Sequence, residues 1–335
     1  TDQEGGLVQR LRNSRGFTNI PSAKRIGEAA SPEQAYEVGR VIGEELKSVG
    51  INWNFGPDLD VATNPNNPAI AKLKRAISKE PELVALLGGQ VIRGVQGAGV
   101  LATAKHFPGH GDVAGDSHAG AVALNKSWEE ILATELVPFI EAVNQDVASI
   151  MIGHITVPTV PDVPEAGKEC DQLPASLNPF FMRYFLRKQL GYEGLIVTDD
   201  MSMGAISNLY PNQGEACMRA ILAGADSVII RSGGEKQVIP YICERIAQGG
   251  PESIELSARI RESGERILRT KKKYDVVPFR ATPPLKQPVS TPAHRQVVQE
   301  IMDQSDAIYG QDPAKKDSYP EVAPSSQGLK DLVGP

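Results

Sequence analysis

Short apolar segments alternate with helical patterns along most of this chain, and this alternation limits the folds open to it. The apolar segments are only four to six residues long, which is typical of strands and too short for buried helices. Strands are predicted at 51–55, 99–104, 148–152, 195–198 and 226–230, and helices at 31–49, 80–96, 127–144, 179–190, 215–223, 236–248 and 251–273. Nearly all-apolar strands separated by helices predict a parallel sheet covered on both faces, and so a barrel or a doubly wound sheet.

The distribution of proline divides the chain in two. Nine of the 25 prolines lie in the last 60 residues, which is too many for packed helices or inner strands. We therefore expect a folded unit over residues 1–275 and an extended tail over residues 276–335. One helix is predicted within the tail, at 291–309, because Pro292 lies in its first turn and apolar residues recur at helical spacing.

Charge and composition exclude several classes of function. A net charge of −6 and an isoelectric point near 5.5 argue against nucleic-acid binding, and no apolar segment approaches the roughly 20 residues that span a bilayer. The three cysteines, Cys170, Cys217 and Cys243, are widely spaced, which predicts reduced thiols and neither a disulfide framework nor a cysteine metal site. The chain starts at Thr1 with no initiator Met and no signal-like segment, so we expect residues before it to be missing. The compartment stays open, with the cytoplasm favoured.

The most distinctive stretch runs from Lys105 to His118 and reads KHFPGHGDVAGDSH. It contains three of the five histidines of the chain, together with two aspartates and three glycines. The strand predicted before it gives way to a loop at the proline and the glycines. Lys105 and His106 are therefore expected at the C-terminal end of a strand, where α/β barrels carry their catalytic residues.

The histidines of this stretch have two separable roles. His106 and His110 show the i, i+4 spacing of helical metal ligands, but Pro108 between them disfavours a helix, so no metal site is predicted. A structural role, anchoring the loop by hydrogen bonds, accounts for His110. Asp116 and His118 are two residues apart and project to the same side of an extended segment. An aspartate that accepts the imidazole N–H orients the ring and favours its protonated form, which makes His118 a candidate general acid or base.

A second reactive segment follows the predicted strand 195–198, which leads into Asp199 and Asp200. Adjacent residues on a strand face opposite ways, so only one of the two carboxylates can point into a site. The alternation does not decide which, and a helix cap or a loop hydrogen bond is the structural alternative for Asp200. Polar residues also follow other strands: Asp2, Asp58, Asp60 and His154. Such a polar rim suits neutral sugars, and no nucleotide-binding glycine loop is present, so no cofactor is predicted.

These segments together resemble a known family. Residues Lys105 to His118 are similar to the KHFPGHG-x4-DSH signature of the β-N-acetylglucosaminidase branch of glycoside hydrolase family 3. Supporting matches follow in the order of the family at residues 2–6, 8–10, 54–61, 64–68, 174–177 and 194–200. The resemblance implies a (β/α)8 TIM-type barrel over residues 1–275. This barrel would be N-terminally incomplete, because the first strand, first helix and second strand of the family precede the segment that begins at Asp2.

The resemblance also implies roles for individual residues. Asp199 falls on the nucleophile of the family, which attacks the anomeric carbon and forms a covalent glycosyl-enzyme. His118, paired with Asp116, falls on the general acid/base, where most retaining glycosidases use a second carboxylic acid. The residues that would bind the sugar hydroxyls are Asp2, Arg75, Lys105 and His106, with Arg10 as a weaker candidate. The implied reaction removes non-reducing terminal β-linked N-acetylglucosamine with retention, from small carbohydrates such as peptidoglycan fragments.

Three other functions remain open at this point. A family 3 β-glucosidase is the nearest, although such enzymes generally lack the Asp-Ser-His loop. An N-acetylglucosaminide phosphorylase is the second, because a histidine acid/base would not repel an incoming phosphate as a carboxylate would. An inactive sugar-binding protein is the third, and the presence of Asp116, His118 and Asp199 argues against it. The helix at 291–309 is similar to the start of the second domain of larger family members, and the sequence does not fix the oligomeric state.

Overall fold

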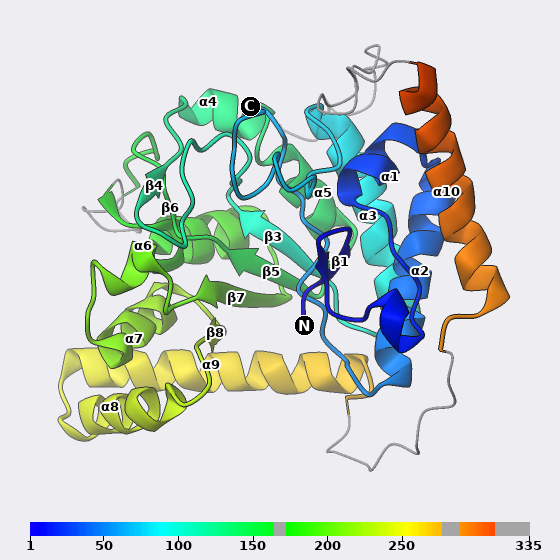
Figure 1. The fold of residues 1–335 in the computed structure, drawn as a ribbon. Coiled ribbons are helices and arrows are strands. Elements are labelled where there is room, and N and C mark those ends of the chain that lie inside the picture. The colour runs from blue at the N-terminus through cyan, green and yellow to red at the C-terminus, as the bar shows by residue number, and fades with distance from the viewer. Residues whose placement is uncertain (164–171, 277–288, 312–335) are drawn as a thin grey trace.

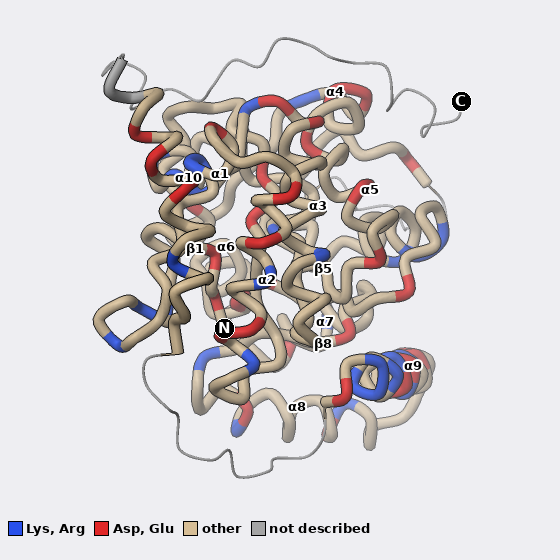
Figure 2. Tube along the Cα trace, turned by 90° about the vertical axis from the view of Figure 1, so that its right-hand side faces the viewer, with Lys and Arg blue, Asp and Glu red and all other residues tan. Residues whose placement is uncertain are grey.

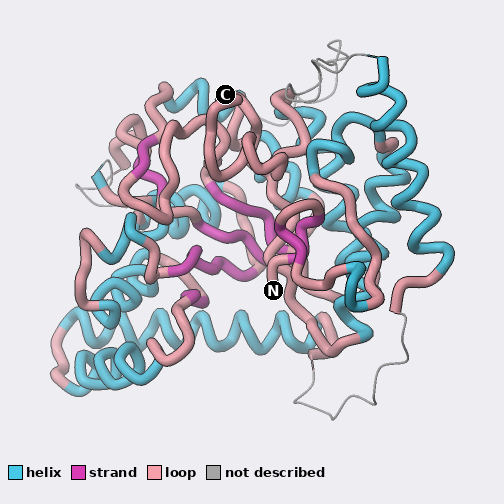
Figure 3. The backbone as a smooth tube through the Cα atoms, in the orientation of Figure 1, coloured by secondary structure: helices cyan, strands magenta, loops and turns pink. Residues whose placement is uncertain are grey.

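The centre of the fold is a parallel sheet of four strands in the order β3–β5–β7–β8. In this computed structural model, residues 1–163, 172–276 and 289–311 are described. The four strands are β3 (Thr103–Phe107), β5 (Ser149–Ile152), β7 (Leu195–Asp200) and β8 (Ser227–Ile229). Phe107 lies beside Ile152, and Ile152 beside Thr198. The strands lie side by side (Figure 3), and the C-terminal ends of three neighbouring strands therefore meet at one edge of the sheet, as their arrowheads show (Figure 1).

Helices separate the strands along the chain and surround the sheet (Figure 1). The α-helices are α1 (Ala23–Ala29), α2 (Pro32–Ser48), α3 (Pro81–Gly97), α4 (Trp128–Ala133), α5 (Val137–Asn144), α6 (Gly204–Ser207), α7 (Gln213–Ala223), α8 (Glu235–Ala247), α9 (Pro251–Lys273) and α10 (Pro292–Gln311). Two 3-10 turns, η1 (Asn13–Arg15) and η4 (Ala175–Leu177), and one π-helix, η5 (Phe180–Gln189), complete the helical part. Short strands form two further pairs: β1 (Gln3–Gly5) with β2 (Val8–Gln9), and β4 (Val122–Ala123) with β6 (Ile155–Thr156). No described helix combines the length and apolar character needed to cross a membrane.

The segment from Trp53 to Asp58 lies beside β3 and extends the sheet without forming a regular ladder. It is joined by isolated parallel bridges: Trp53 to Leu101, and Asp58 to Lys105. The prediction of a regular strand at 51–55 is therefore wrong, and Pro57, which has no N–H to donate, limits how far such a ladder could continue. The start of the chain lies against the same segment, because the amino group of Thr1 donates to the Trp53 carbonyl oxygen at 3.0 Å. Within the described residues, the hydrogen-bonded sheet does not close on itself.

The helices α2 and α3 pack closely against each other beside β3. A Cβ atom at Gly39 of α2 would lie 2.2 Å from the carbonyl oxygen of Val91, and one at Gly94 of α3 would lie 2.1 Å from that of Tyr36. Only a residue without a side chain permits this separation of the two backbones. The predicted helix starts are confirmed at two capping boxes, Ser31 with Gln34 and Ser127 with Glu130.

Two helices differ from the sequence prediction. The helix expected at 127–144 is divided into α4 and α5, because Pro138 starts a new first turn and Glu135 turns inward to meet Lys126 at 2.7 Å. The helix expected at 179–190 is wound as the π-helix η5. It lies over the aromatic core of the protein, where the rings of Phe107 and Phe181 are 5.8 Å apart. The strand expected at 99–104 is also shifted, since β3 continues through Phe107.

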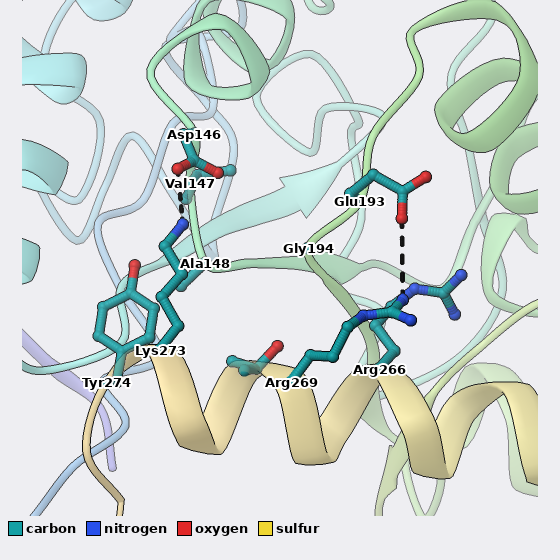
Figure 4. A pocket seen from close by; sticks show the side chains of 10 residues that line it. Asp146, Val147, Ala148, Glu193, Gly194, Arg266, Arg269, Lys273 and Tyr274 are labelled. Carbon is teal, nitrogen blue, oxygen red and sulfur yellow. Dashed lines mark hydrogen bonds and ion pairs between the residues drawn. The ribbon is translucent and has the colours of Figure 1, made fainter.

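The helix α9 runs under the N-terminal ends of β5 and β7, opposite the edge where the strands end. Figure 4 shows a pocket between them, of about 180 Å³, and Figure 2 shows that α9 carries both basic and acidic residues. At the mouth of the pocket, Lys273 meets Asp146 at 2.6 Å. Beneath it the buried Asp226 binds Arg187 at 2.6 Å and Arg266 at 2.7 Å. These ion pairs tie α9 to the sheet.

The helix predicted in the C-terminal part of the chain is present as α10, which packs against α1 and α2. Its buried His294 lies between two glutamates of α2, with Nε2 2.9 Å from Glu44 and Nδ1 3.4 Å from Glu45. Asp306 of the same helix meets Arg25 of α1 at 2.8 Å. The extended segments expected on either side of this helix, and Cys170, lie largely or wholly outside the described residues.

Candidate active site

Charged side chains gather where the parallel strands end. Lys105 and His106 lie within the last three residues of β3, Asp199 lies near the end of β7, and His154 follows β5 by two residues. Because these strands are parallel and in register, their C-terminal ends present side chains to one shared space. The expected polar rim is therefore present in the structure, as is its position at the C-terminal edge of the sheet.

At the centre of this rim is a buried lysine held by two carboxylates. The Nζ atom of Lys105 lies 2.6 Å from Glu4 and 2.9 Å from Asp2, and only 2 % of the Lys105 side chain is exposed. Burial opposes ionisation of Glu4, but the charges of Lys105 and Arg75 outweigh it and lower the pKa of Glu4 to about 2. Glu4 therefore stays ionised at neutral pH beside the buried ammonium of Lys105.

Arg75 completes the cluster from the loop before α3. Its guanidinium binds both oxygens of Glu4, at 2.8 and 2.9 Å, in a bidentate pair. Its third nitrogen donates to the carbonyl oxygen of Ala69 at 3.0 Å. The structure thus brings Arg75 next to Lys105, as its predicted role requires. Arg10 lies at the edge of the same group, with Nη2 3.7 Å from Asp2 and 57 % of its side chain exposed.

The ring of His106 is held in one tautomer. Arg75 Nη2 lies 3.3 Å from Nε2 of His106, and because a guanidinium can only donate, Nε2 accepts. The proton is therefore on Nδ1, which donates to Asp60 Oδ2 at 2.7 Å. Burial, reinforced by the charge of Arg75, lowers the pKa of His106 to about 4. His106 is consequently neutral at pH 7 and is oriented by Asp60.

Asp58, Asp60 and His106 are the group of described residues whose spacing could hold a metal ion, with ligand atoms within 4.8 Å of one another. Each of these groups already has a charged or hydrogen-bonded neighbour, although Asp58 Oδ2 itself makes no hydrogen bond. The Nδ1 proton of His106 is donated to Asp60, and Arg75 Nε lies 3.4 Å from Asp58. Burial and the neighbouring Asp60 raise the pKa of Asp58 well above its usual range. A metal ion here would have to displace the Nδ1 proton of His106 and would lie close to the positive charge of Arg75.

Asp199 is half-buried beside this group. Burial alone would raise the pKa of Asp199, but the imidazoles of His106 and His154, the amide of Asp200 and the ammonium of Lys105 together bring it below its usual value. The amide of Asp200 donates to Asp199 Oδ1 at 2.8 Å. Asp199 is therefore an ionised carboxylate at neutral pH, which is the state that a carboxylate nucleophile requires.

The second aspartate of the pair has a structural role. Asp200 Oδ1 accepts a hydrogen bond from the backbone N–H of Ser202 at 2.8 Å, so the alternative of a loop hydrogen bond is confirmed. The carbonyl oxygen of Asp200 accepts from Nε2 of His154 at 3.0 Å. The other ring nitrogen of His154 therefore accepts from the hydroxyl of Ser176, at 2.7 Å. These contacts fix the turn directly after Asp199.

Asp116 and His118 lie on the loop between β3 and β4, residues 108–121, here called the dyad loop. Asp116 Oδ1 lies 2.8 Å from Nδ1 of His118 and 2.9 Å from its backbone nitrogen, so the predicted contact is present. Nδ1 donates to the carboxylate, which leaves Nε2 for other partners. The His118 side chain is 69 % exposed. Within the described part of the chain, no hydrogen bond or ion pair joins this pair to Asp199 or to Lys105.

Glu4 is the residue of this site that sequence reasoning missed. Asp2 and Glu4 both reach Lys105, and both lie in one extended segment. Residues two apart in such a segment face the same side, so the assignment of Asp2 carried a signal that pointed to Glu4 as well. The side chain of His110, predicted to anchor the loop by hydrogen bonds, does so within the loop, because its Nε2 lies 3.1 Å from the hydroxyl oxygen of Ser117.

Comparison with known proteins identifies the family to which the chain belongs. A model described as the glycosyl hydrolase family 3 N terminal domain matches residues 1–270. The chain belongs to glycoside hydrolase family 3. A family 3 beta-N-acetylglucosaminidase from Paenibacillus sp. str. FPU-7 superposes with a TM-score of 0.80 at 38% identity, covering 91% of this chain and 55% of that one. The α/β TIM-barrel class expected from the sequence is therefore confirmed.

Other family 3 relatives carry related names. A beta-hexosaminidase from Thioalkalivibrio sulfidiphilus is 37% identical over 237 residues, which make up 68% of this chain and 63% of that protein. The structure of a beta-glucoside phosphorylase superposes with a TM-score of 0.77 at 27% identity, covering 86% of this chain and 51% of that one. The chain thus spans less than two thirds of the length of each of these relatives.

Proposed function

We propose that this protein is a retaining β-N-acetylhexosaminidase that removes non-reducing terminal N-acetylglucosamine from β-linked glycans. The observation that carries this proposal is the contrast between two separate groups. Asp199 is an ionised, half-buried carboxylate beside Lys105 and His106, whereas the Asp116–His118 pair is exposed on its own loop. One group suits attack on carbon, and the other suits proton exchange with a leaving group. The names of the relatives support this activity and the choice of sugar.

In the proposed first step, a carboxylate oxygen of Asp199 attacks the anomeric carbon as the bond from that carbon to the leaving oxygen breaks. Nε2 of His118 donates its proton to the leaving oxygen. The product is a covalent glycosyl-aspartate with an alcohol released. In the second step, Nε2 takes a proton from water, the water oxygen attacks the anomeric carbon, and Asp199 leaves as a carboxylate, so the configuration is retained.

Asp116 has a supporting role in both steps. It accepts the Nδ1 proton of His118, which keeps Nε2 as the atom that exchanges protons and stabilises the imidazolium form. The acid/base group is then neutral or cationic rather than a second carboxylate, so it does not repel Asp199.

The cluster around Lys105 is proposed to bind the sugar. Asp2, Arg75, Lys105 and His106 present both donors and acceptors, which a ring of hydroxyl groups can match. Arg10, at the exposed edge, would contribute to the same contacts or to those of the next residue of the glycan. Peptidoglycan fragments are the natural substrates that we propose.

Hydrolysis of p-nitrophenyl β-N-acetylglucosaminide, compared with the corresponding glucoside, tests this proposal. We expect kcat/KM to favour the N-acetylated substrate strongly. A preference for the glucoside would identify a β-glucosidase instead. Binding of N-acetylglucosamine with no turnover of either substrate would identify an inactive sugar-binding protein and refute the proposal.

A phosphorylase is the second candidate, favoured by the likeness to the beta-glucoside phosphorylase and by the histidine in place of a carboxylate acid/base. In that reaction a phosphate oxygen, rather than water, attacks the glycosyl-aspartate, and a sugar 1-phosphate leaves. Product analysis in phosphate buffer separates the two reactions. Free N-acetylglucosamine as the only product supports hydrolysis, and N-acetylglucosamine 1-phosphate as the main product supports phosphorolysis.

A further inference from the structure

The residue between Asp116 and His118 is turned away from solvent. Ser117 is only 2 % exposed, whereas the side chains of its neighbours Asp116 and His118 are 40 % and 69 % exposed. Its hydroxyl oxygen lies 3.1 Å from Nε2 of His110, a buried residue near the start of the same loop whose backbone N–H donates to Asp60. The Ser117 side chain therefore ties the part of the dyad loop that carries His118 to His110, which is itself held to Asp60 by its backbone N–H.

The backbone of the dyad loop is held by a different element. The N–H of Gly204 donates to the carbonyl oxygen of His118 at 3.1 Å, and the N–H of Ala205 donates to that of Ser117 at 3.2 Å. Gly204 is the first residue of α6, which follows β7 after a turn of three residues. The segment that carries Asp199 thus also carries the hydrogen-bond donors that hold the loop of His118.

This pairing requires a glycine at position 204. A Cβ atom there would lie 2.7 Å from the carbonyl oxygen of Ala119 and 2.9 Å from that of His118. Both contacts are with backbone atoms, so any side chain would push the dyad loop away from α6. Gly120, in the same loop, is a matched contrast, because a Cβ atom there would meet nothing within 4 Å.

We propose that Ser117 and Gly204 are positioning residues that hold the dyad loop, and His118 with it, against the segment that follows Asp199. Ser117 fastens the part of the dyad loop that carries His118 to His110 near the start of that loop, and Gly204 lets the loop lie directly on the segment that follows β7. The inference rests on the proposed function, in which His118 exchanges the proton and Asp199 attacks carbon. Misplacing a reacting group by about 1 Å can slow a step about 100-fold, and here the loss would fall on proton transfer alone.

Two substrates isolate that step. A β-linked N-acetylglucosamine disaccharide has an alcohol leaving group that must be protonated. Dinitrophenyl β-N-acetylglucosaminide has a phenolate leaving group that departs without a proton. For Gly204→Ala and for Ser117→Ala, we expect kcat/KM for the disaccharide to fall by about 100-fold, within the range that a general acid contributes. We expect kcat/KM for the dinitrophenyl glycoside to stay close to that of the unmodified protein. Gly120→Ala should leave both substrates unaffected, and Ser117→Thr, which keeps the hydroxyl, should recover most of the loss.

The variant His118→Ala distinguishes a failure of this inference from a failure of the proposed function. If His118→Ala loses the disaccharide selectively and neither positioning variant does, the inference is overturned and the proposed function stands. If His118→Ala spares the disaccharide, the proposed function itself is wrong. An equal loss on both substrates in the positioning variants, with a lower melting temperature, would indicate damage to the fold and would also overturn the inference. Should Gly204→Ala fail to fold, Ser117→Ala with its threonine control decides the question.

Discussion

The buried pair between Glu4 and Lys105 makes a quantitative prediction about stability and pH. Replacing Glu4 by glutamine removes the carboxylate that neutralises both Lys105 and Arg75. The pKa of Glu4 is lowered from 4.5 to about 2. At about 1.4 kcal/mol per pH unit, the ionised carboxylate then contributes roughly 3 kcal/mol to the free energy of unfolding at pH 7. We therefore expect Glu4→Gln to lower that free energy by about 3 kcal/mol, as for a broken buried ion pair.

The pH dependence of this loss follows from the direction of the shift. A carboxyl group whose pKa is lower in the folded protein contributes its full stability above the unfolded value of 4.5 and loses it as the pH falls toward 2. The gap between the unmodified protein and Glu4→Gln should therefore shrink by roughly half between pH 7 and pH 3.

Urea unfolding followed by tryptophan fluorescence at the two pH values measures this gap. Glu37→Gln is the control, because Glu37 pairs with Arg40 on the partly exposed surface of α2. Its effect at pH 7 should stay within about 1 kcal/mol. A gap for Glu4→Gln that is below about 1 kcal/mol at pH 7, or that is the same at pH 7 and pH 3, would refute the electrostatic account of this cluster.

Two further predictions concern parts of the molecule away from the candidate site. Asp226→Asn should lower the free energy of unfolding by about 3 to 5 kcal/mol, because it leaves buried arginines without their carboxylate. The control Glu255→Gln, at an exposed pair with Arg183, should lower it by less than about 1 kcal/mol, and equal effects of the two variants in urea unfolding would contradict the argument. Iodoacetamide labelling of the native protein, mapped by mass spectrometry, should modify the exposed Cys243 and spare the buried Cys217. Burial and the charge of Asp200 raise the pKa of the Cys217 thiol to about 12, so little of the reactive thiolate forms. Equal labelling rates would contradict this prediction and show that the core around α7 opens readily.

The fold class could be predicted from the sequence because local signals agree with the final structure over long stretches. Helices with clear caps, such as α2 and its Ser31, begin where the sequence indicates. The limits of β3 could not be predicted, because Lys105 and His106 are polar and resemble a loop, although they pair as a strand. Their burial is stabilised by Glu4 and Asp60, which lie far away along the chain. Local periodicity carries no information about such partners.

The candidate site, too, could be predicted from the sequence only in part. The contact between Asp116 and His118 follows from their spacing and was predicted. The place of Arg75 beside His106, and the hold that Gly204 has on the dyad loop, depend on pairings between distant segments. Those pairings emerge only when the sheet and its loops are assembled.

The central claim is that the carboxylate of Asp199 bonds to the anomeric carbon of the sugar. Mass spectrometry after treatment with a 2-fluoro or 5-fluoro N-acetylglucosamine-type inactivator tests it most directly, because the trapped sugar stays on the residue that attacked. The account predicts a single labelled peptide with the sugar on Asp199. A label on Asp200, or on no aspartate at all while the enzyme is inactivated, would contradict it.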